Sequence, residues 1–205
     1  MGALPDAGAR LAAHPERMEP IEQLNTVMPT LTDLVAGVKE DQLADPTPCA
    51  RWAVRDLLGH LAGGLTSATS ALREGTPVDT TPRPELLGDD RGTAFTGVVE
   101  RLNTAVGRRG ALETMVTLPF GVLPAEVLVR FLAFDMTVHS WDVAMSTNQL
   151  FVPDDDVVAE AAAFAHGAIA PEMRDGDTFA AALSAPDGTS ALERLVAFAG
   201  RRSLG

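Results

Sequence analysis

The chain has 205 residues, of which 46% are hydrophobic and 21% charged, and its formal net charge at pH 7 is −12. This length allows one domain with a substantial core and leaves little room for two. The acidic balance argues against a nucleic-acid partner, which needs a positive surface, and against binding to an anionic membrane. The apolar residues are mainly Ala, Leu and Val, and Tyr is absent, which favours helices over sheets.

The sequence contains one cysteine, Cys49, so no disulfide can form within the chain. We therefore expect a reducing, cytoplasmic location. No run of about 18 apolar residues is present, so we expect no transmembrane helix, and the N-terminal residues lack the apolar core of a signal peptide. We predict a tail over residues 1–17, in which His14 has no role, and a single domain over residues 18–205.

The first predicted helix begins at Pro20, where apolar residues start to recur at spacings of three and four, and it extends to about Val38. Pro29 lies inside this pattern and should kink or divide the helix. Residues 41–49 contain two prolines and are predicted to form a loop.

A second helix is predicted from Trp52 or Ala53 to about Arg73. The adjacent Gly63 and Gly64 within it cost up to about 2 kcal/mol relative to two alanines. Such a pair indicates either that another group approaches the helix closely there or that the helix has a simple kink.

The chain after this helix alternates between loops and helical patterns. Residues 74–90 form a long loop of the kind that covers a site or is mobile. A helix over 91–108, a short extended piece over 114–118 and a long, very apolar helix over 124–146 are expected to follow.

The C-terminal part is predicted to add shorter helices. Three acidic residues at 154–156 suit the positive end of a helix that ends near Ala170, and Ser190 and Glu193 form a capping-box pattern at the start of another. About four long helices plus one or two short ones predict an all-α helical bundle.

Three polar residues stand out against this apolar background. Asp135 and His139 lie four residues apart in the most apolar helix and therefore share one face. His60 lies beside the core stripe of an earlier helix, and a bundle can bring it to the same point. Burying these groups is costly unless something binds them. On spacing alone, however, we would favour ordinary buried, hydrogen-bonded residues over a metal site.

Two imidazoles and a carboxylate are a ligand set that Zn²⁺ accepts, as do Fe²⁺, Ni²⁺ and Mn²⁺. Bound metal would compensate the charge of Asp135 and keep His60 and His139 neutral. The open coordination position could take a water or a thiolate.

Two segments resemble the mycothiol-dependent maleylpyruvate isomerase N-terminal family, which has a DinB-like fold and is found in actinobacteria. The first is TPCARWAVRDLLGHL at residues 47–61, and the second is DMTVHSWD at residues 135–142. The segment from Pro119 to Pro124 and the tail over 173–201 are also similar to members of this family.

The resemblance implies a DinB-like four-helix bundle with a divalent metal, most often Zn²⁺, at His60, Asp135 and His139. It further implies mycothiol as a co-substrate. The isomerase carries a glutamate at the position of Asp135, and it has a second domain for which we expect this chain to be too short.

Other residues near these segments have two readings each. Asp142 and Asp56 are candidates to hydrogen-bond a ligand histidine, or they form surface ion pairs or caps. Trp141 and Trp52 are expected to pack against and orient the ligand helices. Cys49 is a nucleophile or, in the reading we favour, a structural turn residue.

The remaining candidates carry weaker signals. His166 is expected to be an ordinary exposed or hydrogen-bonded histidine. Arg51, Arg55 and Arg130 either meet an anionic substrate or, as we favour, offset the acidic surface.

We therefore expect a metal-dependent, thiol-using transferase or isomerase that acts on a small electrophile. The alternatives are a metal-dependent hydrolase of the same fold and a non-catalytic bundle that binds a small molecule or metal. We expect a monomer or homodimer with a small-molecule substrate.

Overall fold

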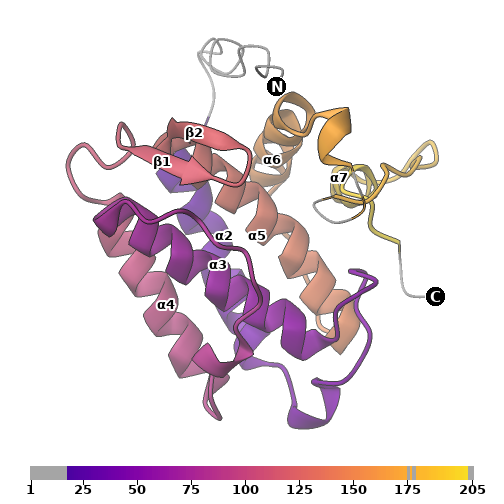
Figure 1. Cartoon of the computed structure of the whole chain (residues 1–205). Helices are drawn as coiled ribbons and strands as arrows, with labels where there is room; N and C mark the ends of the chain where they lie inside the picture. Colours follow the sequence, from indigo (N-terminus) through magenta and orange to yellow (C-terminus); the bar gives the residue numbers. More distant parts are fainter. Residues whose placement is uncertain (1–17, 175, 177–178, 203–205) are drawn as a thin grey trace.

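The computed structural model describes residues 18–174, 176 and 179–202 (Figure 1). The predicted tail over residues 1–17, with His14, lies outside the described residues. Six α-helices occur in the described part: α2 (Pro20–Ala36), α3 (Val54–Glu74), α4 (Arg91–Val106), α5 (Ala125–Thr147), α6 (Asp155–Ala168) and α7 (Ala191–Phe198). Short 3-10 turns lie at Glu40–Gln42, Pro84–Leu86 and Pro171–Met173.

Helices α2, α3, α4 and α5 form a four-helix bundle. Helix α2 packs against α4 and α5, and α3 packs against the same two helices, so the four enclose one apolar core. Helices α6 and α7 pack on the outer side of α5 around a second, aromatic-rich cluster. The predicted all-α bundle with short additional helices is confirmed, and no helix in the described part is both long and apolar enough to cross a bilayer.

Helix α5 is the central element of the fold (Figure 1). It contacts α2, α3, α6 and α7 and buries residues on nearly all of its faces, which explains why its sequence is apolar without a clear stripe. Pro124 precedes its first turn, and Asn148 ends it in the left-handed region with φ of 54°. Most polar residues in the middle of this helix are therefore buried against neighbouring elements rather than in solvent.

The expected extended segment is one half of a hairpin. Strands β1 (Met115–Leu118) and β2 (Gly121–Pro124) pair antiparallel and lead directly into α5. Helix α2 continues through Pro29 without being divided. Of the two effects predicted for Pro29, a kink or a division, the division does not occur.

The loop after α3 returns along that helix and lies close to its backbone. A Cβ atom on Gly63 would lie 2.9 Å from the carbonyl oxygen of Thr81, and one on Gly59 would lie 2.6 Å from the backbone nitrogen of Pro84. Arg83 also donates its N–H to the Gly59 carbonyl at 2.9 Å. The close approach of the loop therefore explains why residue 63 is a glycine. It does not explain Gly64, where a Cβ would meet nothing within 4 Å.

These environments predict opposite effects for two single substitutions in one helix. Gly59→Ala should destabilise the protein by about 1–3 kcal/mol, because the new methyl group collides with loop backbone. Gly64→Ala should stabilise it by up to about 1 kcal/mol through helix propensity alone. Urea unfolding of both variants measures the difference, and equal stability of the two would contradict the packing described for this loop.

Candidate metal centre

His60, Asp135 and His139 converge between α3 and α5, and their ligand atoms all lie within 4.8 Å of one another. The two carboxylate oxygens of Asp135 face different histidines: Oδ2 lies 3.4 Å from Nε2 of His60, and Oδ1 lies 3.4 Å from Nε2 of His139. The two imidazole rings meet edge to face, with their centroids 4.9 Å apart. The structure thus brings together the three residues that the sequence singled out.

The other nitrogen of each imidazole contacts an oxygen acceptor. Nδ1 of His60 lies 3.2 Å from the carbonyl oxygen of Thr80, and Nδ1 of His139 lies 2.8 Å from Oδ2 of Asp142. A carbonyl and a carboxylate oxygen only accept, so both Nδ1 atoms carry the hydrogen. In a neutral imidazole, this arrangement leaves the Nε2 lone pair pointing at Asp135.

Lone pairs on two neutral imidazoles would therefore face the lone pairs of a carboxylate. Such a cluster requires a positive charge at its centre, from protons on the rings or from a metal ion. The pKa values reflect this need in the metal-free protein. Burial would raise the pKa of Asp135 and lower that of His139, but their mutual attraction outweighs burial and shifts both in the opposite direction.

The donor set and its spacing fit a metal ion. Tetrahedral ligands at about 2.0–2.1 Å from zinc are separated by about 3.3–3.4 Å. Each Nε2 lies 3.4 Å from a different oxygen of Asp135, so the three groups are about as close as ligands of one ion. The His139 side chain is 3% exposed, whereas those of His60 and Asp135 are 11% and 16% exposed. A small molecule could therefore approach from the side of His60 and Asp135.

Trp52 packs over both histidines. Its ring centroid lies 4.6 Å from that of His60 and 6.0 Å from that of His139. The loop before α3 is held in shape by Thr47, whose hydroxyl accepts the Cys49 N–H at 3.1 Å and donates to the Trp52 carbonyl at 2.8 Å. Trp52 thus lies where it restricts the orientation of the two rings.

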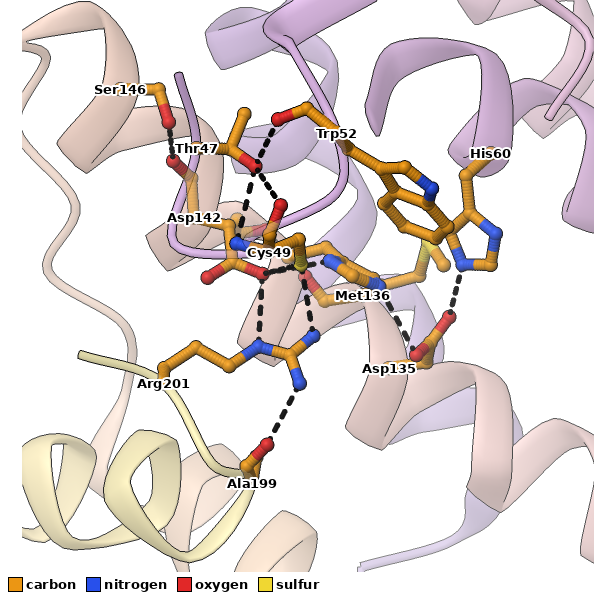
Figure 2. A network of polar contacts seen from close by, with 12 residues as sticks. Thr47, Cys49, Trp52, His60, Asp135, Met136, Asp142, Ser146, Ala199 and Arg201 are labelled. Atoms are coloured by element: carbon orange, nitrogen blue, oxygen red, sulfur yellow. Dashed lines mark hydrogen bonds and ion pairs between the residues drawn. The ribbon is translucent and has the colours of Figure 1, made fainter. Parts of the chain in front are cut away.

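A second polar cluster lies on the Nδ1 side of His139. Figure 2 shows its members Cys49, Asp142 and Arg201 close together and apart from Asp135. Three groups contact Oδ2 of the fully buried Asp142: Nδ1 of His139 at 2.8 Å, the Cys49 thiol at 3.3 Å and Nε of Arg201 at 3.2 Å. Burial would raise the pKa of Asp142, but the Arg201 charge and the bond to His139 together lower it.

Cys49, His139 and Asp142 also lie within 4.8 Å of one another and resemble a ligand set. However, the Arg201 guanidinium donates to Oδ2 of Asp142 and, through Nη2 at 3.4 Å, to the Cys49 sulfur. A second cation at this point would be repelled. The electrostatics therefore favour a metal at His60, Asp135 and His139 over one at Cys49.

The other predicted residues are distributed as follows. Asp56 accepts the Ala53 N–H at 3.0 Å, so it caps the start of α3, as one of its two predicted roles required. Trp141 is half-buried, and its ring is not among those that contact the two histidines in the described part of the chain. His166 is exposed and stacks on Phe198, with centroids 4.1 Å apart.

Arg130 lies away from the cluster, because it pairs with Glu126 at 3.2 Å and donates to the Met18 carbonyl. Arg201 is the participant that sequence reasoning missed. The one sequence signal for Arg201 was its position in the segment 173–201, which resembles the tail of related chains. Such a resemblance does not show which residues Arg201 contacts.

The fold and the site place this protein in the class of all-α helical bundles that carry a candidate metal centre, the His–Asp–His cluster, between two helices. The family model of the mycothiol maleylpyruvate isomerase N-terminal domain matches residues 24–144, more than half of the chain. The chain therefore belongs to this family.

Individual relatives extend the comparison. The uncharacterized proteins MT0763 and Rv0738 of Mycobacterium tuberculosis are each 28% identical over 185 residues, which covers 90% of this chain and 98% of theirs. Crystal structures of the mycothiol-dependent maleylpyruvate isomerase and of one of its mutants have TM-scores of 0.53 and 0.54 at 14% identity. The match covers 69% of this chain and 66% of the isomerase, so this likeness concerns the fold.

The buried ion pair behind His139 predicts a large effect of one substitution. Asp142→Asn should lower the free energy of unfolding by about 3–5 kcal/mol, because it leaves Arg201 without its anion. Glu85→Gln is the control, since its pair with Arg83 is exposed on both sides (45% and 68%) and should contribute at most about 1 kcal/mol. Chemical denaturation in the presence of a chelator compares them, and similar losses in both variants would contradict the assignment.

Proposed function

We propose that this protein binds one divalent metal ion, with Zn²⁺ as the first choice, through His60, Asp135 and His139. The observation that carries the proposal is the meeting of two Nε2 atoms with one carboxylate, while both Nδ1 atoms are held by acceptors. That pattern is the usual one for histidine ligands of a metal. Ni²⁺, Fe²⁺ and Mn²⁺ suit the same set and are alternatives.

We further propose that the protein is an enzyme that uses a low-molecular-weight thiol of the mycothiol type to isomerise or transfer a small electrophilic substrate. Membership of the family and the likeness to a mycothiol-dependent isomerase support this reaction class. A divalent ion bound here would supply a Lewis acid that lowers the pKa of a thiol or of water.

The residues of this chain would have separate tasks around such a reaction. His60 and His139 offer neutral nitrogen ligands, and Asp135 offers the negative charge that favours a dication. The greater exposure of His60 and Asp135 gives the substrate its direction of approach. Trp52 covers the rings of both histidines and shields them from water.

Cys49 is not proposed as the reacting thiol. Its sulfur contacts Asp142 and Arg201 on the Nδ1 side of His139, whereas Asp135 faces Nε2. The thiol that reacts must therefore come from a separate molecule.

Metal content tests the first part of the proposal. The purified wild-type chain should hold one divalent ion, whereas His139→Ala should lose at least about 10-fold in metal affinity. His166→Ala is the matched control, because this exposed histidine stacks on Phe198 and should leave the metal in place. Elemental analysis with chelator competition provides the measurement, and equal, near-zero metal in wild type and His139→Ala would refute metal binding.

Turnover tests the second part. With mycothiol and maleylpyruvate as probes, the metal-loaded protein should show thiol-dependent isomerisation, and Asp135→Ala should reduce it by at least about 100-fold. His166→Ala again serves as the control and should keep wild-type turnover. A metal-loaded wild type that turns over neither this probe nor other electrophiles with the thiol would point instead to a non-catalytic binding protein.

A further inference from the structure

Arg201 joins three parts of the chain at the back of His139. It follows α7, which ends at Phe198, and its Nη1 donates to the Ala199 carbonyl at 2.8 Å. Its other nitrogens reach Asp142 in α5 and Cys49 in the loop before α3. Figure 2 shows the guanidinium directed from the C-terminal ribbon toward these two residues.

The carboxylate of Asp142 is held from one side only. All of its hydrogen bonds go to Oδ2, while the buried Oδ1 has no partner among the described residues. Of the three groups at Oδ2, the thiol is a weak donor and His139 is the group to be oriented. Arg201 is therefore the one permanently charged, directional partner that fixes this carboxylate.

The orientation of Asp142 bears on the metal centre through His139. A carboxylate that accepts the Nδ1–H keeps Nε2 as the lone-pair nitrogen and fixes the plane of the ring. Without Arg201, a fully buried carboxylate would lack a full counter-charge and would turn toward other donors. His139 would then lose the acceptor that sets its tautomer.

Arg201 lies outside the segment that the family model matches. The family match ends at residue 144, so it includes Cys49 and Asp142 but not Arg201. The cation that completes the cluster is supplied by the segment after α7.

We propose that Arg201 is a positioning residue of the metal centre, which sets metal affinity by holding Asp142 and, through it, the ring of His139. The inference rests on the proposed function for its metal. It gives the segment after α7 a role in the metal centre, although Arg201 contacts Asp142 and Cys49 rather than the proposed metal ligands.

The test uses the full-length chain and the variants Arg201→Met, Arg201→Lys and Arg202→Met. Arg201→Met should weaken Zn²⁺ binding about 10–100-fold and alter the visible spectrum of the Co²⁺-substituted protein. Arg201→Lys keeps the positive charge but lacks the planar guanidinium donors, so its Zn²⁺ affinity should lie between those of wild type and Arg201→Met. Arg202→Met removes the same charge from an exposed neighbour and should change affinity by less than about threefold.

A double-mutant cycle distinguishes action through Asp142 from a direct effect. Arg201→Met and Asp142→Asn should not be additive in Zn²⁺ affinity, because each removes the same support of His139. Additive losses would overturn the proposal. The proposal would also be overturned if a folded Arg201→Met kept the wild-type Zn²⁺ affinity and Co²⁺ spectrum. If Arg201→Met does not fold, the same result in Arg201→Lys would overturn it.

The hydrogen bond from His139 to Asp142 gives a readout that does not require metal. In chelated protein, the Nδ1–H proton of His139 should be hydrogen-bonded and slow to exchange with solvent, and Arg201→Met should shift its resonance and speed its exchange. An unchanged Nδ1–H resonance would overturn the positioning role. Failure of the wild-type chain to bind Zn²⁺ or Co²⁺ would refute the proposed function, and the Nδ1–H resonance would still decide whether Arg201 positions His139.

Discussion

Two imidazoles on different helices turn Nε2 toward one carboxylate, that of Asp135, while each Nδ1 is bound to an oxygen that only accepts. Neutral rings would place lone pairs against lone pairs at the centre of this cluster. The arrangement is therefore stable only with a positive charge between the three groups, and a divalent ion meets that need with the ligand types present. The surrounding fold keeps these groups in position.

The scaffold supplies each constraint from a different segment. Helix α5 carries Asp135 and His139 on one face, and α3 packs against it with His60. Gly59 and Gly63 let the following loop lie against α3, which brings the Thr80 carbonyl to Nδ1 of His60. The two glycines lower the helix propensity of α3, but the close loop contact that they permit fixes the tautomer of His60.

Periodicity predicted the bundle well, because long amphipathic segments have a strong pattern and their packing leaves few arrangements. The pair Asp135 and His139 followed from helical spacing, and His60 came from a motif on another helix. The bond between Asp142 and His139 was one of two interpretations of Asp142 and is confirmed. The pairing of Asp142 with Cys49 and Arg201 could not be predicted, since these two residues are 152 positions apart in sequence. Asp56 was ambiguous because a helix-cap carboxylate has the same spacing as a partner of His60.

Anomalous diffraction from crystals of the full-length protein, measured on both sides of the zinc absorption edge, tests the central claim most directly. We predict one anomalous peak at about 2.0–2.2 Å from Nε2 of His60, Nε2 of His139 and a carboxylate oxygen of Asp135. A zinc-loaded crystal with no peak between these residues, or with the peak at Cys49 and Asp142, would contradict the account.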